Sequence, residues 1–232
     1  MNEQHLSNIE LYYSPDGTIN NHILINGEDF NHIIKVMRHS EQDIIYITDG
    51  RGNIHKSLIH SINKLSLSAE PVKTYHYENV NQNNFFCIPK LRNSDRFEFA
   101  LEKCVELGVT NFIIFESIRT VSKNKRTDRW NKILIAAMKQ SLRCYLPEIK
   151  VVSSIKEIFS FYGEKIGFEQ NSYNKISALK IIPDVNYYYI FGPEGGLDKD
   201  ELEMFNPESI YNLADNRLRT ETAIIKAASL LL

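Results

Sequence analysis

The stretch YYYIFGPEGGLDKDE, residues 187–201, joins an apolar strand, a glycine-rich turn and an acidic helix start without interruption. Glycines at a strand-to-helix turn let a ligand approach the backbone closely and leave amide groups directed at it. In an open α/β sheet, the crevice beyond such a strand is the usual ligand site. The turn matches neither GxGxxG nor GxxxxGKS, so dinucleotide and P-loop phosphate binding are not favoured. The alternative is a tight turn whose glycines only satisfy backbone geometry.

Strand and helix patterns alternate around this stretch. Continuous apolar runs indicate parallel strands covered on both faces, and apolar spacings of three and four indicate helices. One such helix is followed by Gly108, which suits a helix C-cap. The alternation predicts an α/β domain with a mainly parallel sheet. The expected strands are 85–89, 112–115, 165–168 and 187–191, and the expected helices are 96–107, 128–142, 199–205 and 221–231.

The N-terminal third has a different pattern. Between 23 and 72, short β-branched runs are separated by Gly, Asn and Asp, which indicates hairpins and a small β-barrel. One helix is expected at 28–38 from its apolar spacing. The polar, asparagine-rich segment 75–84 separates the two patterns. We therefore expect two domains, 1–74 and 75–232.

Composition narrows the class of protein. The 232 residues are 43% hydrophobic and 24% charged, as in ordinary globular proteins. No apolar run approaches the roughly 20 residues of a membrane span, and the polar N-terminus lacks an export signal, so we expect a cytoplasmic protein. Three widely spaced cysteines predict no disulfide framework, and histidines without HxH or HxxxH spacing predict no metal site.

The net charge of −2 conceals an internal asymmetry. Residues 119–150 contain nine Lys and Arg against two Asp and Glu, whereas residues 1–72 contain five against nine. A local basic segment suits a phosphate-bearing partner, because neutralising phosphates releases counterions. The alternative is a solvated helix face.

A second polar cluster, RLRTETA at 217–223, stands at the start of the last expected helix. Thr220 is a candidate N-cap, although Ala223 three residues on leaves no capping box. One interpretation is an ion pair between Arg219 and Glu221. The other is that this loop and the turn at 210–213 present backbone groups to an adenine ring, while Arg219 meets a negative substrate group.

Together, GPEGGL at 192–197 and LRTETA at 218–223 resemble the C-terminal signature of the 16S ribosomal RNA uracil-N3 methyltransferases, which belong to the SPOUT class of knotted enzymes. The resemblance continues in order along nearly the whole chain. Its other motifs are HIIKVMR at 32–38, DGRGN at 49–53, EKCVELG at 102–108, and QSLR at 140–143 with Pro147.

This resemblance implies a PUA-like N-terminal β-barrel that helps to hold RNA, and a C-terminal α/β domain tied in a trefoil knot. Periodicity alone could not indicate a knot. The resemblance also implies S-adenosylmethionine as cofactor and a homodimer with a shared RNA site, with neither DNA nor a membrane as partner. The implied cofactor contacts are Phe191, Gly192, Gly196, Leu213, Leu218 and Thr222, and the implied RNA contacts are Lys35, Arg38, Lys123, Arg126 and Gln140.

The implied reaction is direct methyl transfer to N3 of a uracil in 16S ribosomal RNA, without a metal. Arg219 and Arg143 are expected to orient RNA or stabilise the uracil anion, and Glu221 is a candidate proton acceptor. The alternatives are ribose 2′-O-methylation within the same fold and a non-catalytic RNA-binding ribosome-assembly factor.

Two positions depart from the family pattern. Lys139 stands where an acidic residue often precedes the Gln-Ser pair, and Leu11 stands where an arginine often precedes the aromatic pair. Both positions belong to the RNA contacts that the resemblance implies.

Overall fold

The computed structural model describes residues 6–119 and 127–232 and divides into two compact units. The first unit takes the chain up to Asn79 together with Ile135–Leu146, and the second takes Val80–Leu134 and Pro147–Leu232. The sequence did not predict that residues 135–146 would belong to the N-terminal unit. The domain division at 74/75 stays a prediction, five residues from the first of these divisions.

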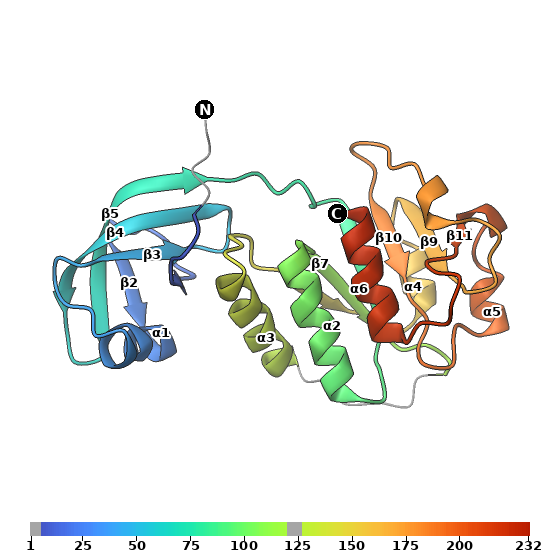
Figure 1. Ribbon diagram of the computed structural model, residues 1–232, viewed down its shortest axis with the longest axis horizontal. Helices are drawn as coiled ribbons and strands as arrows, with labels where there is room; N and C mark the ends of the chain where they lie inside the picture. The colour runs from blue at the N-terminus through green and yellow to red at the C-terminus, as the bar shows by residue number, and fades with distance from the viewer. Residues whose placement is uncertain (1–5, 120–126) are drawn as a thin grey trace. The chain divides into compact units, whose positions relative to one another are not determined.

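The first unit is a curled five-stranded sheet, as the sequence predicted (Figure 1). Its strands lie in the order β1-β3-β4-β5-β2; β1 and β3 run parallel, and the other neighbours run antiparallel. The pairing of β4 with β5 shifts register at two places, and such bulges bend a sheet. The strands are β1 (Leu11–Tyr13), β2 (Ile23–Asn26), β3 (Ile44–Thr48), β4 (Asn53–Ile62) and β5 (Ser66–His76).

The helix expected at 28–38 is present in two parts. Helix α1 (Gly27–Asn31) continues into the π-helical turn η1 (His32–Val36). Phe30 and Ile33 are buried, and they pack into the core of this unit because they lie three residues apart on one helix face. The same core includes Tyr12, Ile23, Ile25, Ile45, Ile47, Ile59, Leu67 and Ala69.

The second unit contains a six-stranded sheet in which every pair of neighbours is parallel, as predicted. The order is β11-β9-β10-β6-β7-β8. Apolar runs such as Tyr187–Ile190 are buried along their whole length because helices cover both faces of the sheet. The strands are β6 (Asn84–Pro89), β7 (Asn111–Phe115), β8 (Glu148–Val151), β9 (Glu164–Phe168), β10 (Tyr187–Ile190) and β11 (Ile210–Tyr211).

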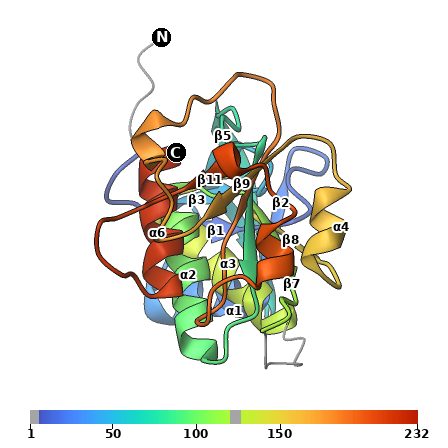
Figure 2. The ribbon, with the colours of Figure 1, turned by 90° about the vertical axis from the view of Figure 1, so that its right-hand side faces the viewer.

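Helices α2 and α6 cover one face of this sheet, and α4 covers the other (Figure 2). The side chain of Asn93 caps the start of α2 by accepting from the amides of Asp95 and Arg96, and Gly108, with φ of 102°, ends it as predicted. The helices are α2 (Ser94–Leu107), α3 (Thr127–Gln140), α4 (Ile155–Phe159), α5 (Lys199–Leu202) and α6 (Thr220–Leu231), with 3₁₀ turns η2 (Ile176–Ala178) and η3 (Pro207–Ser209).

The strand order indicates where a ligand-binding crevice lies. From the central strand β6, the chain adds β7 and β8 on one side, whereas β10, β9 and β11 lie on the other. A crevice forms at the carboxyl ends of parallel strands where the order reverses in this way. No helix within the two described ranges is long and apolar enough to cross a membrane.

Candidate active site

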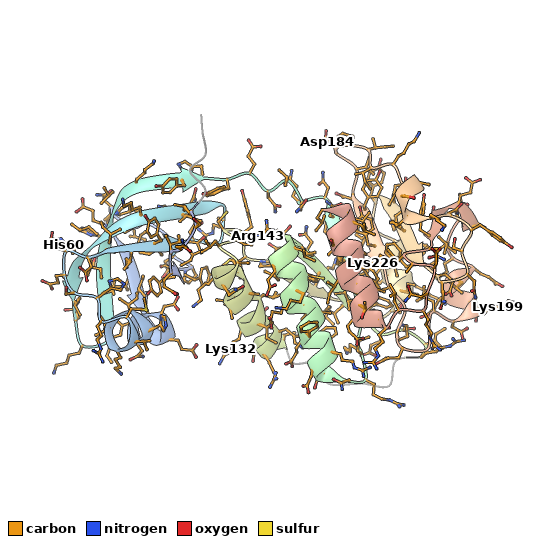
Figure 3. The ribbon with its side chains drawn as sticks, viewed as in Figure 1. His60, Lys132, Arg143, Asp184, Lys199 and Lys226 are labelled. Carbon is orange, nitrogen blue, oxygen red and sulfur yellow. The ribbon has the colours of Figure 1, made fainter. Side chains whose placement is uncertain are left out.

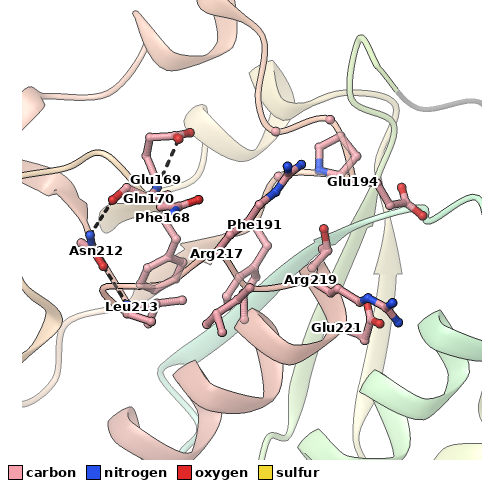
Figure 4. A pocket seen from close by; sticks show the side chains of 18 of the residues that line it. Phe168, Glu169, Gln170, Phe191, Glu194, Asn212, Leu213, Arg217, Arg219 and Glu221 are labelled. Atoms are coloured by element: carbon pink, nitrogen blue, oxygen red, sulfur yellow. Dashed lines mark hydrogen bonds between the residues drawn. The ribbon is translucent and has the colours of Figure 1, made fainter.

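One pocket of about 670 Å³ lies at the carboxyl ends of β9, β10 and β11 (Figure 4). Its volume lies within the range of small-molecule sites. Every residue that lines it belongs to the second unit. The lining residues come from the ends of these three strands, from the loops that follow β10 and β11, and from the first turns of α2 and α6.

The glycine turn after β10 forms one wall of the pocket. A Cβ on Gly192 would lie 2.8 Å from the amide nitrogen of Leu197 and 3.0 Å from the carbonyl carbon of Gly196, so the close approach of backbone to backbone requires glycine there. Gly196 has a φ of +74°, and its amide donates to the carbonyl of Pro193 at 2.8 Å. Residues 192–197 are called the cofactor loop below, and 192–196 line the pocket.

The acidic residues after the turn cap helix α5. The side chain of Asp198 accepts from the amide of Asp200, and Glu201 reaches back to the amide of Asp198 to complete a capping box. These two carboxylates therefore stabilise the start of α5.

Aromatic and aliphatic side chains form a second wall. The rings of Phe168 and Phe191 stack with centroids 4.8 Å apart, and both line the pocket (Figure 4). Leu213 is buried and Leu218 is half-buried, and both line the pocket. An apolar wall with few polar groups is typical of sites that bind a flat heterocycle.

The side-chain amide of Asn212 holds the loop around this residue in place. The side-chain nitrogen of Asn212 donates to the carbonyl of Gln170, and its side-chain oxygen accepts from the amide of Ala214 at 2.7 Å. The predicted turn at 210–213 includes the short strand β11, which pairs with β9. These bonds fix the backbone of 212–214 at the edge of the pocket.

Two charged side chains meet at the entrance to α6. Oε1 of Glu221 lies 3.5 Å from Nε of Arg96, so the ion pair of Glu221 is with Arg96 on α2 and not with Arg219. Oε2 of Glu221 is buried and has no hydrogen-bond partner within the described residues. An unpaired buried acceptor costs about 1–3 kcal/mol, so this oxygen is poised to accept from a ligand.

The start of α6 also corrects a predicted cap. The helix begins at Thr220, and its N-cap is Arg219, which makes no side-chain cap bond. Thr220 is instead buried inside the first turn. The backbone of Arg219 is extended at this point. Its side chain is exposed and lines the pocket.

Most of the predicted ligand residues in the second unit meet in this one pocket. Thr222 does not line it and is exposed on α6. The residues that do are Phe191, Gly192, Gly196, Leu213, Leu218, Arg219 and Glu221. Sequence reasoning missed several other lining residues, because they come from α2 and from the end of β9 and only the fold brings them here; these are Arg96, Phe168, Glu169 and Gln170.

The remaining predicted residues belong elsewhere. Lys35, Arg38, Gln140 and Arg143 are exposed in the first unit, and Arg143 is labelled in Figure 3. Lys123 and Arg126 lie outside the described residues. No group of three or more His, Cys, Asp or Glu side chains that could hold a metal ion occurs in the part of the chain that the structure describes.

The two departures from the family pattern have structural partners. Lys139 forms an ion pair with Oδ1 of Asp29, whose Oδ2 accepts from the amide of Tyr13 at 2.8 Å. Leu11 is 4% exposed and packs in an apolar cluster with Ile54 and Cys144. Both side chains therefore contribute to the packing of the first unit.

Comparison with known proteins adds a decisive observation. The sequence model of a family described as an RNA methyltransferase domain matches residues 80–232, and that of an RNA methyltransferase PUA domain matches residues 25–72. The chain belongs to this RNA methyltransferase family. As a member, it is an enzyme that methylates RNA, and its pocket lies within the matched catalytic domain.

Individual relatives agree with this membership. The protein is 30% identical over 223 residues to ribosomal RNA small subunit methyltransferase E of Bacillus subtilis, covering 88% of this chain and 87% of that protein. A crystal structure of a probable rRNA-methyltransferase from Porphyromonas gingivalis has 25% identity and a TM-score of 0.85, covering 96% of this chain and 97% of that one. The ribosomal RNA small subunit methyltransferase E from Neisseria gonorrhoeae, solved with S-adenosyl methionine bound, shares the fold with a TM-score of 0.80 at 23% identity over 96% of each chain.

Proposed function

We propose that this enzyme transfers the methyl group of S-adenosylmethionine to N3 of a uridine in 16S ribosomal RNA of the small subunit. The observation that carries the proposal is the meeting, in one pocket, of the cofactor loop with Arg219 and Glu221. The names of the relatives from B. subtilis and N. gonorrhoeae support the substrate, and the ligand of the second supports the cofactor.

The pocket fits S-adenosylmethionine. Gly192 and Gly196 line the pocket without side chains, the stacked Phe168 and Phe191 offer an apolar wall, and Oε2 of Glu221 is a buried acceptor without a protein donor among the described residues. We propose that the cofactor is held by Phe191, Gly192, Gly196, Leu213 and Leu218. Thr222, exposed on α6 outside the pocket lining, is not part of this set.

When bound, S-adenosylmethionine supplies a methyl group on a positively charged sulfur. The lone pair of N3 forms the new N–C bond, the pair of the S–C bond stays on sulfur, and the N3 proton must leave. We propose that Glu221 accepts this proton and that Arg219 stabilises the uracil anion. Holding both reactants in line supplies much of the rate, because orientation can contribute roughly 7–11 kcal/mol.

We further propose that RNA is held by the PUA-like domain, 1–74, together with basic and amide side chains outside the pocket. Lys35, Arg38, Gln140 and Arg143 are exposed in the first unit and can contact phosphates or sugars. Lys123 and Arg126 complete the proposed set. The catalytic domain would then be 75–232, and the reaction would take place in the cytoplasm, where ribosomes are assembled.

A homodimer with a shared RNA site is part of the proposal. Leu230 and Leu232, at the end of α6, are 53% and 37% exposed, and such apolar side chains are suited to burial against a second subunit. Light scattering on the purified protein tests this, since a mass of twice 26.9 kDa is expected. A monomer at micromolar concentration would contradict it.

The reaction is tested by methyl transfer from labelled S-adenosylmethionine to purified small subunits that lack base methylation, followed by mass spectrometry of the nucleosides. We expect label in 3-methyluridine, lost with Arg219→Ala and kept with Lys226→Ala, a charge removal on the same helix outside the pocket lining. Label in a 2′-O-methyl nucleoside would overturn the proposed position. Binding of cofactor without any transfer would favour the assembly factor.

A further inference from the structure

Glu201 is a buried carboxylate that joins two separate loops. The residue is 2% exposed, although it stands on the short helix α5. Its Oε2 accepts from the hydroxyl of Ser117 at 2.9 Å and from the amide of Asp198 at 2.8 Å. Its Oε1 accepts from the amide of Ile118 at 3.0 Å. One carboxylate thus ties the segment after β7 to the residue that directly follows the cofactor loop.

Arg119 makes a second connection between the same two segments. Its guanidinium donates to the carbonyl of Gly195 at 2.6 Å and to Oδ2 of Asp198 at 3.1 Å. The side chain is 46% exposed, so it serves as a strap across the surface and not as part of a core. Hydrogen bonds from a charged donor are among the stronger ones in proteins.

The cofactor loop is therefore held from outside at several points. The amide of Arg92, in the loop after β6, donates to Oε1 of Glu194 at 3.1 Å, in addition to the bond from Arg119 to Gly195. Glu201 holds Asp198, the residue that follows the loop, by accepting from its amide. The loop itself has one internal backbone bond of this kind, from Gly196 to Pro193. Its conformation thus depends on neighbouring segments. Neither Arg119 nor Glu201 lines the pocket.

We infer that Arg119 and Glu201 are positioning residues that hold the cofactor loop in its binding conformation and so set the affinity for S-adenosylmethionine without touching it. This rests on the proposed function. A loop that is fixed before binding loses less conformational freedom when the ligand arrives, and this gain appears directly in the dissociation constant. Removing one of these hydrogen bonds leaves every contact to the ligand possible, but it lowers the fraction of molecules whose cofactor loop is in the binding conformation.

The substitution Glu201→Gln tests the carboxylate with minimal change of shape. Both oxygens of Glu201 accept from backbone amides, one from Ile118 and one from Asp198. A glutamine must place its NH₂ group against one of these N–H donors, whichever way the amide is turned. Ser117→Ala is the milder companion, because it removes one hydroxyl donor and leaves both backbone bonds in place.

The experiment measures binding of S-adenosylmethionine to the purified full chain by calorimetry. We expect Arg119→Ala and Glu201→Gln to weaken binding roughly tenfold, Arg119→Lys to weaken it less, and Ser117→Ala to weaken it least. The control is Lys199→Ala, because Lys199 is also on α5 but is 84% exposed and pairs with Glu203 (Figure 3). It should bind as the unchanged protein does.

Kinetics separate positioning from a direct role. With Arg119→Ala, KM for S-adenosylmethionine should rise about tenfold, while kcat at saturating cofactor and KM for RNA stay within about twofold. If Glu201→Gln does not fold, the Arg119 series decides the inference alone. Unchanged cofactor affinity in Arg119→Ala, or an effect confined to RNA, would overturn the inference and leave the proposed function standing. Failure of the unchanged protein to bind S-adenosylmethionine would overturn both.

Discussion

At the scale of single residues, the two carboxylate oxygens of Glu221 lie in different environments. Oε1 faces the guanidinium of Arg96, whereas Oε2 is buried without a partner among the described residues. Burying an unpaired acceptor lowers stability, and a ligand that supplies the missing donor would offset this cost. The N3–H group of a uracil is a donor of that kind.

Replacing Glu221 by Gln should therefore impair the chemical step. Because an amide cannot take the N3 proton, we expect kcat to fall about 100-fold while the dissociation constant for S-adenosylmethionine stays within a few-fold. Single-turnover methyl transfer measures the step directly. Glu203→Gln, which changes a carboxylate that is 66% exposed, serves as the control. A Glu221→Gln enzyme with normal kcat would exclude the proton-acceptor role.

The thiols allow a second prediction at this scale. Burial raises the pKa of Cys144 from 9.0 to about 11, with a further contribution from Asp49. Burial likewise raises the pKa of Cys87 and of Cys104. All three should resist iodoacetamide at pH 8 in the folded protein and react after unfolding, as mass spectrometry would show.

The same shift has a defined sign for stability. Since the folded pKa of Cys144 is the higher one, its contribution to stability is complete below pH 9 and is lost as the pH rises from about 9 to about 11. Denaturant titrations across this range should show falling stability, and Cys144→Ala should reduce the slope. Rapid alkylation of the native protein at pH 8 would contradict the burial on which this rests.

At the scale of elements, the glycine turn depends on one close backbone approach. Gly192→Ala would place a Cβ against the backbone of Leu197 and Gly196, which cannot yield as a flexible side chain can. We expect cofactor affinity to fall more than tenfold, with the circular dichroism spectrum preserved. Gly195→Ala should cost less, because its Cβ would meet the nearest atom, Cδ of Arg119, at an ordinary 3.5 Å. Equal affinities for the two variants would disprove the steric explanation.

The sequence predicted the strongly patterned elements and missed short, partly exposed ones. The end of helix α2 was placed correctly because Gly108 is a clear stop, and β10 was placed to within one residue because its apolar run is continuous. Strand β8 has four residues with alternating partial exposure at the sheet edge, and α4 has five residues. Neither is long enough to show a hydrophobic periodicity in the sequence.

The candidate site divides in the same way. The cofactor loop and the start of α6 were visible because each is a compact motif. Arg96 and Phe168 were not, because an arginine early in a helix and a phenylalanine at a strand end are ordinary residues until tertiary structure brings them together. The implied trefoil knot is a property of chain path and stays a prediction.

At the scale of the whole molecule, the first unit is completed by a segment from far along the chain. The amide of Gly52 donates to the carbonyl of Cys144 at 2.9 Å, and the amide of Leu146 donates to the carbonyl of Gly50 at 2.8 Å. Tyr145 donates through its hydroxyl to the carbonyl of Tyr77. Residues 135–146 therefore act as part of the N-terminal unit.

A fragment of residues 1–79 should fold poorly by itself. It lacks Cys144 and so leaves the cluster around Leu11 and Ile54 uncovered. We expect a broad, low-temperature unfolding transition, and a cooperative one at higher temperature when residues 127–146 are joined by a flexible linker. Circular dichroism melts of the two proteins make the comparison. Identical transitions would show that the returning segment contributes nothing.

The path of the chain also constrains how the two segments of the first unit can evolve. Because the backbone passes between the two units at 79/80, 134/135 and 146/147, exchanging the N-terminal part of the gene with that of another lineage would leave residues 135–146 opposite a foreign sheet. Lys139 and Asp29, 110 positions apart, would then lose their match. The two stretches must be inherited as a set, and a charge change at one should be accompanied in descendants by a compensating change at the other.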